Sequence, residues 1–176
     1  MRRQAFTARE IAVLGLLSAL LFGAKMAMAP LPNIEPVSLL IIVYAAVLGL
    51  RALVPVYVYA LLEILTWGFG YWSACYLYVW AVLALAALAL RRMESPLGWA
   101  ALSGAFGLCF GALCSLTYWV AGGWAYALSW WISGIPFDLL HGAGNFAMAL
   151  ALFKPCRAVL YRLYYGKSEN TKYRPT

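Results

Sequence analysis

Charged residues are scarce in this chain. They make up 11% of its 176 residues, with six acidic side chains and a single histidine, whereas hydrophobic residues make up 65% and the mean hydropathy is +0.81. So few charges cannot cover the core of a water-soluble domain of this length, and no long polar stretch could form a separate soluble domain. The composition therefore excludes a soluble protein and predicts an all-α integral membrane protein built as one helical bundle.

Several catalytic and metal-binding patterns are also missing. The four cysteines (Cys75, Cys109, Cys114 and Cys156) show neither paired metal-ligand spacing nor the framework of a disulfide-rich domain. The sequence has no glycine-rich loop of the GxxxxGK[ST] kind and no HExxH pair to accompany its lone histidine. These absences predict no metal site, no cofactor and no ATP hydrolysis by the chain itself.

What the sequence does contain is apolar segments of membrane-spanning character. They predict a bundle of six transmembrane helices, at residues 11–29, 37–48, 52–67, 72–90, 97–120 and 134–153. Residues 1–153 would form the transmembrane domain. Residues 154–176 alternate cations with Leu, Val and Tyr before a polar end, which predicts a cytoplasmic interfacial segment followed by a disordered tail.

The distribution of cations predicts the orientation of this bundle. With six spans, nearly every arginine and lysine falls on one side of the membrane, including Arg9, Arg51 and all cations from Lys154 onward. Lys25 is the exception. Because cytoplasmic loops are enriched in Lys and Arg, both termini are predicted to be cytoplasmic.

Residues 134–153 carry three polar side chains on one side of an otherwise apolar segment. At 100° per residue, Asp138, His141 and Asn145 fall with Gly134 within an arc of about 60°. A carboxylate facing lipid is costly, so these groups are expected to turn inward. They predict the polar wall of a substrate pocket, and the alternative is a satisfied polar cluster that joins helices.

Other polar residues are predicted to converge on the same outer region. Glu63 lies about 16 Å along its helix, where a glutamate is either paired or functional. Asn33 and Glu35 lie in the proline-rich loop PLPNIEP, on the predicted outer side with Lys25 nearby. The buried polar residues thus predict a site open to the exterior.

Small residues recur along the first predicted helix. Ala12, Gly15, Ala19 and Gly23 form a ladder that allows another helix to approach closely. Its partner is either another subunit or a helix of the same bundle.

Together these features resemble the substrate-specific S-components of energy-coupling factor (ECF) transporters, bacterial importers of vitamins and other micronutrients. The resemblance covers most of the chain and is carried by its size, six helices with cytoplasmic ends, the small-residue ladder, the run LPNIEPVSLL and the polar segment SGIPFDLLHGAGNF. It implies a location in the bacterial cytoplasmic (inner) membrane. It also implies that the ladder contacts a membrane coupling subunit, which is driven by two ATPase subunits.

The resemblance further implies a vitamin-sized ligand held toward the outside, with no chemistry performed by this chain. In that case the aromatic rings would stack on a planar ligand, and the polar side chains would bind its edge. Lys25 would pair either with Glu63 or with a carboxylate of the ligand. The residues expected to contact substrate are Asn33, Glu35, Glu63, Trp67, Trp72, Tyr76, Trp80, Asp138, His141 and Asn145. Two acids and one base favour a ligand rich in hydrogen-bond donors, such as a nitrogen heterocycle.

Two other functions compete with the importer. An intramembrane enzyme would use His141 with Asp138 or Glu63 as acid and base. A non-transport scaffold subunit would use the ladder on the first helix, and its polar cluster would be structural.

Overall fold

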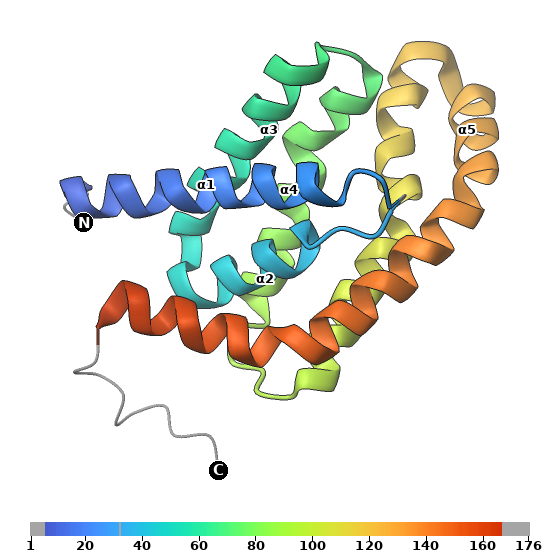
Figure 1. Ribbon diagram of the computed structural model, residues 1–176. Coiled ribbons are helices and arrows are strands. Elements are labelled where there is room, and N and C mark those ends of the chain that lie inside the picture. The colour runs from blue at the N-terminus through green and yellow to red at the C-terminus, as the bar shows by residue number, and fades with distance from the viewer. Residues whose placement is uncertain (1–5, 32, 167–176) are drawn as a thin grey trace.

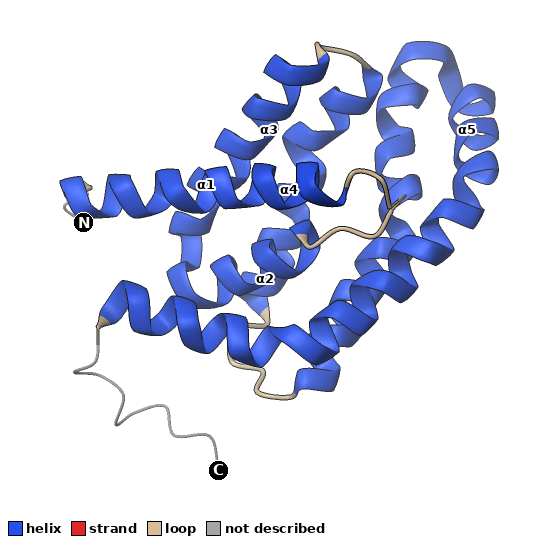
Figure 2. Ribbon diagram, in the orientation of Figure 1, coloured by secondary structure: helices blue, strands red, loops and turns tan. Residues whose placement is uncertain are grey.

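The chain folds entirely into helices and short connections wherever the computed structural model describes it, which is residues 6–31 and 33–166 (Figures 1 and 2). The elements are α1 (Ala8–Met28), α2 (Val37–Leu48), the 3-10 helix η1 (Gly49–Ala52), α3 (Leu53–Trp67), α4 (Tyr71–Ala89) and α5 (Pro96–Tyr165). No strand occurs in these ranges. The prediction of an all-helical chain is therefore confirmed.

Within residues 6–31 and 33–166, four helical stretches are long and apolar enough to cross a membrane. They are Ala8–Met28, Val37–Trp67, Tyr71–Ala89 and Pro96–Tyr165. Large apolar side chains lie on the outer surface, for example Leu16, Leu65 and Val120, which are 71%, 72% and 86% exposed. Such a surface suits lipid rather than water, so the structure has the character of a membrane protein.

The first helix begins with a complete capping box. The hydroxyl of Thr7 accepts a hydrogen bond from the Glu10 amide at 3.2 Å, and the Glu10 carboxylate accepts one from the Thr7 amide at 2.9 Å. These bonds satisfy two of the amide groups left free at a helix start. The helix then runs to Met28, where Pro30 and Pro36 border the loop leading to α2. Its first turn thus starts slightly earlier than the apolar pattern predicts.

α2 forms the centre of the bundle. All of its residues except Leu40 and Ala46 are buried. It packs against α4 and α5, while α1 packs mainly against α3, and α4 contacts both α3 and α5. A helix that is apolar all round needs such complete coverage, because it has no polar face to expose.

α5 consists of two arms that fold back on each other (Figure 1). At about 1.5 Å per residue, 70 residues would extend about 105 Å, far beyond the roughly 30 Å of a bilayer core. The reversal occurs at Gly123, whose φ of 79° and ψ of −179° are conformations open essentially to glycine alone. We call residues 96–122 the first arm and residues 124–165 the second arm.

The second arm starts earlier than predicted. The sequence predicts a span at residues 134–153, but residues 124–133 are already helical, and the Ser133 hydroxyl donates to the Trp130 carbonyl at 2.8 Å. Gly123, rather than a capping side chain, ends one arm and starts the next. Residues 154–165 continue this arm, so their position at a membrane surface remains a prediction. The predicted disordered tail falls on residues outside the described ranges.

Candidate functional site

A cavity of about 440 Å³ opens where the C-terminal end of α1 and the loop after it meet α3, α4 and both arms of α5. Its size falls within the range of small-molecule sites. Apolar, aromatic and ionisable side chains share its wall. The lining residues are Lys25, Met26, Met28, Ala29, Leu31, Asn33, Glu35, Glu63, Trp67, Trp72, Tyr76, Phe110 and His141.

The Lys25 ammonium group holds the polar side of this cavity together. Its Nζ lies 3.1 Å from Glu63 Oε2, donates to the Tyr76 hydroxyl at 2.6 Å and lies 4.0 Å from Glu35 Oε2. The side chain of Glu63 is only 4% exposed, so the ion pair with Lys25 offsets the cost of burying its charge. Lys25 and Glu63 therefore do pair, as one of the two sequence interpretations predicted.

Glu35 brings a second carboxylate to the cavity from the loop between α1 and α2. Burial raises the pKa of the Glu35 carboxyl, the Lys25 ammonium acts in the opposite direction, and the nearby Glu63 carboxylate raises it further. Two carboxylates thus share one ammonium group. With both acids ionised, the three groups carry one net negative charge, which favours a ligand that supplies positive charge or hydrogen-bond donors.

Two polar atoms at the cavity wall have free bonding capacity. Glu63 Oε1 and His141 Nε2 are buried and make no hydrogen bond to a protein group in the described part of the chain. The His141 ring packs edge-on against Phe110 at a centroid distance of 4.9 Å. Buried polar groups are normally satisfied, so both atoms fit the edge of a bound polar molecule.

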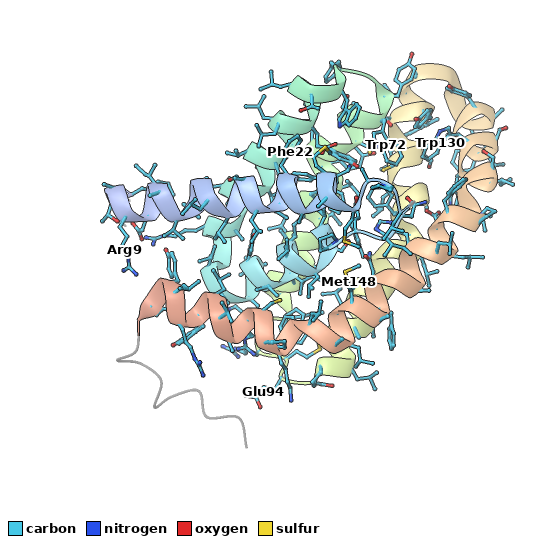
Figure 3. All side chains as sticks on the ribbon, viewed as in Figure 1. Arg9, Phe22, Trp72, Glu94, Trp130 and Met148 are labelled. Atoms are coloured by element: carbon cyan, nitrogen blue, oxygen red, sulfur yellow. The ribbon has the colours of Figure 1, made fainter. Side chains whose placement is uncertain are left out.

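Aromatic side chains form another part of the wall, next to the polar groups. The rings of Trp72 and Tyr76 lie 5.8 Å apart between centroids, and Trp72 also contacts Phe110 at 5.8 Å and Trp130 at 6.2 Å. Figure 3 shows Trp72 and Trp130 on neighbouring helices in the same region of the molecule. Such rings present flat apolar faces that suit a planar ligand.

Three predicted contact residues do not line the cavity. Trp80 is fully buried behind it, packed against Tyr76 at 5.3 Å and against Phe110 at 5.4 Å. Asp138 Oδ1 accepts a hydrogen bond from the Gly111 amide at 2.9 Å, and Asn145 Nδ2 donates to the Ser38 hydroxyl at 2.9 Å.

Asp138 and Asn145 each join helices, as the alternative interpretation predicts, but Asp138 Oδ2 is buried and has no hydrogen-bond partner in the described part of the chain. Asp138 links the two arms of α5, and Asn145 links the second arm to α2. All three polar residues do turn inward, as their shared arc predicts. Only His141 reaches the cavity, because the neighbouring helices cover the turns above and below it.

The sequence patterns did not identify Phe110 as a lining residue, nor the apolar lining residues at the end of α1 and in the loop after it, which are Met26, Met28, Ala29 and Leu31. Phe106 and Phe110 are four residues apart and contact each other at 5.8 Å. That spacing marks one helix face, but it does not distinguish a face lining a cavity from one that faces lipid or core.

The small-residue ladder of α1 lies on the outside of the structure. Ala12, Gly15, Ala19 and Gly23 are all exposed, and no atom lies within 4 Å of a Cβ placed on either glycine. The opposite face carries the buried residues Leu14, Leu17, Ser18 and Leu21. The ladder thus makes no close contact with another helix of the described chain.

A second polar cluster lies at the far end of α1. Arg51 forms an ion pair with Glu10 and donates to the Tyr164 hydroxyl at 2.9 Å, and Arg9 donates to the carbonyls of Leu163 and Tyr164. By helical rise, this cluster lies about 22 Å along α1 from Lys25. The cavity and these arginines therefore occupy opposite ends of α1.

Comparison of the chain with protein-family models, with curated proteins and with solved structures finds no match.

Proposed function

We propose that the chain is the substrate-binding membrane subunit of an ATP-driven ECF-type importer, which captures a vitamin or related small micronutrient from the exterior. The observation that carries this proposal is the cavity, whose wall combines an ion network and free polar atoms with a set of aromatic rings. No residue is assigned a catalytic role, because the cavity's features serve binding. We place the protein in the bacterial cytoplasmic membrane.

The proposed topology is a six-span bundle with both termini in the cytoplasm. It counts α2, α3 and each arm of α5 as separate spans, together with α1 and α4. The clustering of Arg9 and Arg51 near the C-terminal turns of α5 supports it, since cations favour the cytoplasmic side. The cavity, at the other end of α1, would then open outward.

The ligand class follows from the lining of the cavity. Two carboxylates and one ammonium group favour a ligand rich in hydrogen-bond donors, and the aromatic wall favours a flat one. A nitrogen heterocycle combines both properties. Glu63 Oε1 and His141 Nε2 would bind its polar edge, while Asn33 and Glu35 would cover it from the loop.

A function as an importer also requires partner subunits. The exposed ladder of α1 would dock on a membrane coupling subunit, which would be driven by two ATPase subunits. Small side chains let two helix backbones approach closely, and this is a main source of helix association within lipid. The absence of a competing contact within the described bundle supports this assignment.

The experiment that tests the function is identification of a small molecule carried through purification of the full chain in detergent. We expect a flat, donor-rich compound at near-equimolar occupancy by native mass spectrometry. Trp67→Ala should weaken its binding about twofold to tenfold through loss of ring stacking. Trp124→Ala is the matched control, because Trp67 and Trp124 are 68% and 69% exposed but only Trp67 lines the cavity.

Other outcomes would favour the competing functions. Chemical turnover of the bound molecule by the isolated chain would support the enzyme, and absence of both ligand and turnover would support the scaffold. Equal loss of ligand in Trp67→Ala and Trp124→Ala would show that the cavity is not the binding site.

Docking through the ladder makes a separate prediction. Gly15→Leu fills the open face of α1 and should abolish co-purification with the coupling subunit and ATPases, while ligand binding persists. Ala105→Leu adds similar bulk at an exposed position of α5 and should leave the complex intact. Affinity capture followed by protein mass spectrometry measures both. Recovery of the full complex with Gly15→Leu would refute the assignment.

A further inference from the structure

Two of the four cysteines meet between α4 and α5. The sulfur atoms of Cys75 and Cys114 lie 2.7 Å apart, and both residues are fully buried. This separation is shorter than ordinary van der Waals contacts of about 3.5–4.0 Å and longer than the roughly 2.05 Å of a disulfide bond. The two side chains therefore already point at one another, although they are 39 positions apart in the sequence.

The pair lies directly behind the cavity. Cys75 precedes Tyr76, and Cys114 comes one helical turn after Phe110, and both of these neighbours line the cavity wall. Close by, the Tyr78 hydroxyl donates to the Leu113 carbonyl at 2.7 Å, which holds α4 against the first arm of α5. The two sulfurs thus meet beside a hydrogen bond that joins the same two helices.

We propose that Cys75 and Cys114 are a redox-active pair that forms a disulfide bond joining α4 to α5. The oxidant is an organic disulfide. The thiolate of one cysteine attacks it and releases one thiol, and the second cysteine then attacks the resulting mixed disulfide and releases the other. Two protein thiols are oxidised to one S–S bond, and the organic disulfide is reduced to two thiols, so electrons and protons balance.

The remaining cysteines do not compete for this bond. Cys109 is exposed and Cys156 is partly buried. Neither makes a sulfur contact with Cys75 or Cys114. The bond would close a long loop and prevent α4 and the first arm of α5 from separating, so it would fix the cavity wall that contains Tyr76 and Phe110.

The test uses the full-length Cys109→Ser/Cys156→Ser variant in detergent, treated with the small apolar disulfide 4,4′-dithiodipyridine. We expect two thiopyridone molecules released per chain and a monomer mass lower by two hydrogens, with no pyridyl group retained. After unfolding in SDS, alkylation should add no group before reduction and two groups afterwards. Isolated thiols would instead each retain a pyridyl group.

The wild-type chain and a single-thiol variant supply the controls. Exposed Cys109 should retain a pyridyl group in wild type, which shows that the reagent reaches the protein. Adding Cys75→Ala to the double variant leaves Cys114 without its partner, so this thiol should release one thiopyridone, retain one pyridyl group and become alkylatable only after reduction. Two retained pyridyl groups, two thiols that stay reduced while Cys109 reacts, or a disulfide-linked dimer would each overturn the proposal.

Discussion

Replacing Lys25 with methionine is expected to destabilise the folded chain by about 3–5 kcal/mol. The substitution keeps most of the side-chain volume but leaves the Glu63 carboxylate, 4% exposed, without the ammonium group 3.1 Å away. It also leaves Glu35 beside Glu63 with no cation between them. Reversible unfolding in mixed detergent micelles, followed by tryptophan fluorescence, measures the change in the free energy of unfolding.

The matched control is the double variant Lys25→Met/Glu63→Leu. It removes both charges, so it should recover most of the lost stability, since apolar residues of similar volume can replace a buried ion pair at little cost. The Tyr76 hydroxyl loses its donor in both variants and does not distinguish them. If Lys25→Met unfolds at the same free energy as the unchanged chain, Glu63 is not held as an ion in the folded state.

Replacing Gly107 with alanine should cost about 1–3 kcal/mol of stability, because it forces apart the two arms of α5. A Cβ at this position would lie 2.7 Å from the Gly142 nitrogen and 2.8 Å from the His141 carbonyl carbon. These are backbone atoms and cannot rotate away. The same displacement would move His141, so ligand binding should weaken together with the free energy of unfolding, and both can be measured on one preparation.

Gly23→Ala is the matched control for this prediction. No atom lies within 4 Å of its new Cβ, and alanine favours a helix over glycine by about 0.8–1.0 kcal/mol. The isolated chain should therefore be as stable as before or slightly more so. Gly104→Ala is an intermediate case, with Phe146 Cβ at 3.1 Å. Equal stability of the Gly107 and Gly23 variants would show that close approach of the two arms is not required.

The sequence by itself determined that this protein is helical and of membrane character. Long apolar runs with few charges favour helices, which satisfy their backbone hydrogen bonds within one segment when they lie in lipid. Local patterns also predicted the bounds of α2, the inward direction of Asp138, His141 and Asn145, and the alternative in which Lys25 pairs with Glu63. These features follow from the spacing of polar and apolar residues along a helix and from the cost of burying an unpaired charge. Both can be judged from the sequence alone.

Only the tertiary structure decided which of those polar groups share a cavity. His141 reaches the cavity, whereas Asp138 bonds to Gly111 and Asn145 to Ser38. The contact of Cys75 with Cys114 likewise depends on how α4 rests on the first arm of α5. The physical reason is that periodicity fixes only the side of a helix on which a residue lies. The partner that the residue meets depends on the distance and angle between packed helices, and residues far apart in the chain determine that packing.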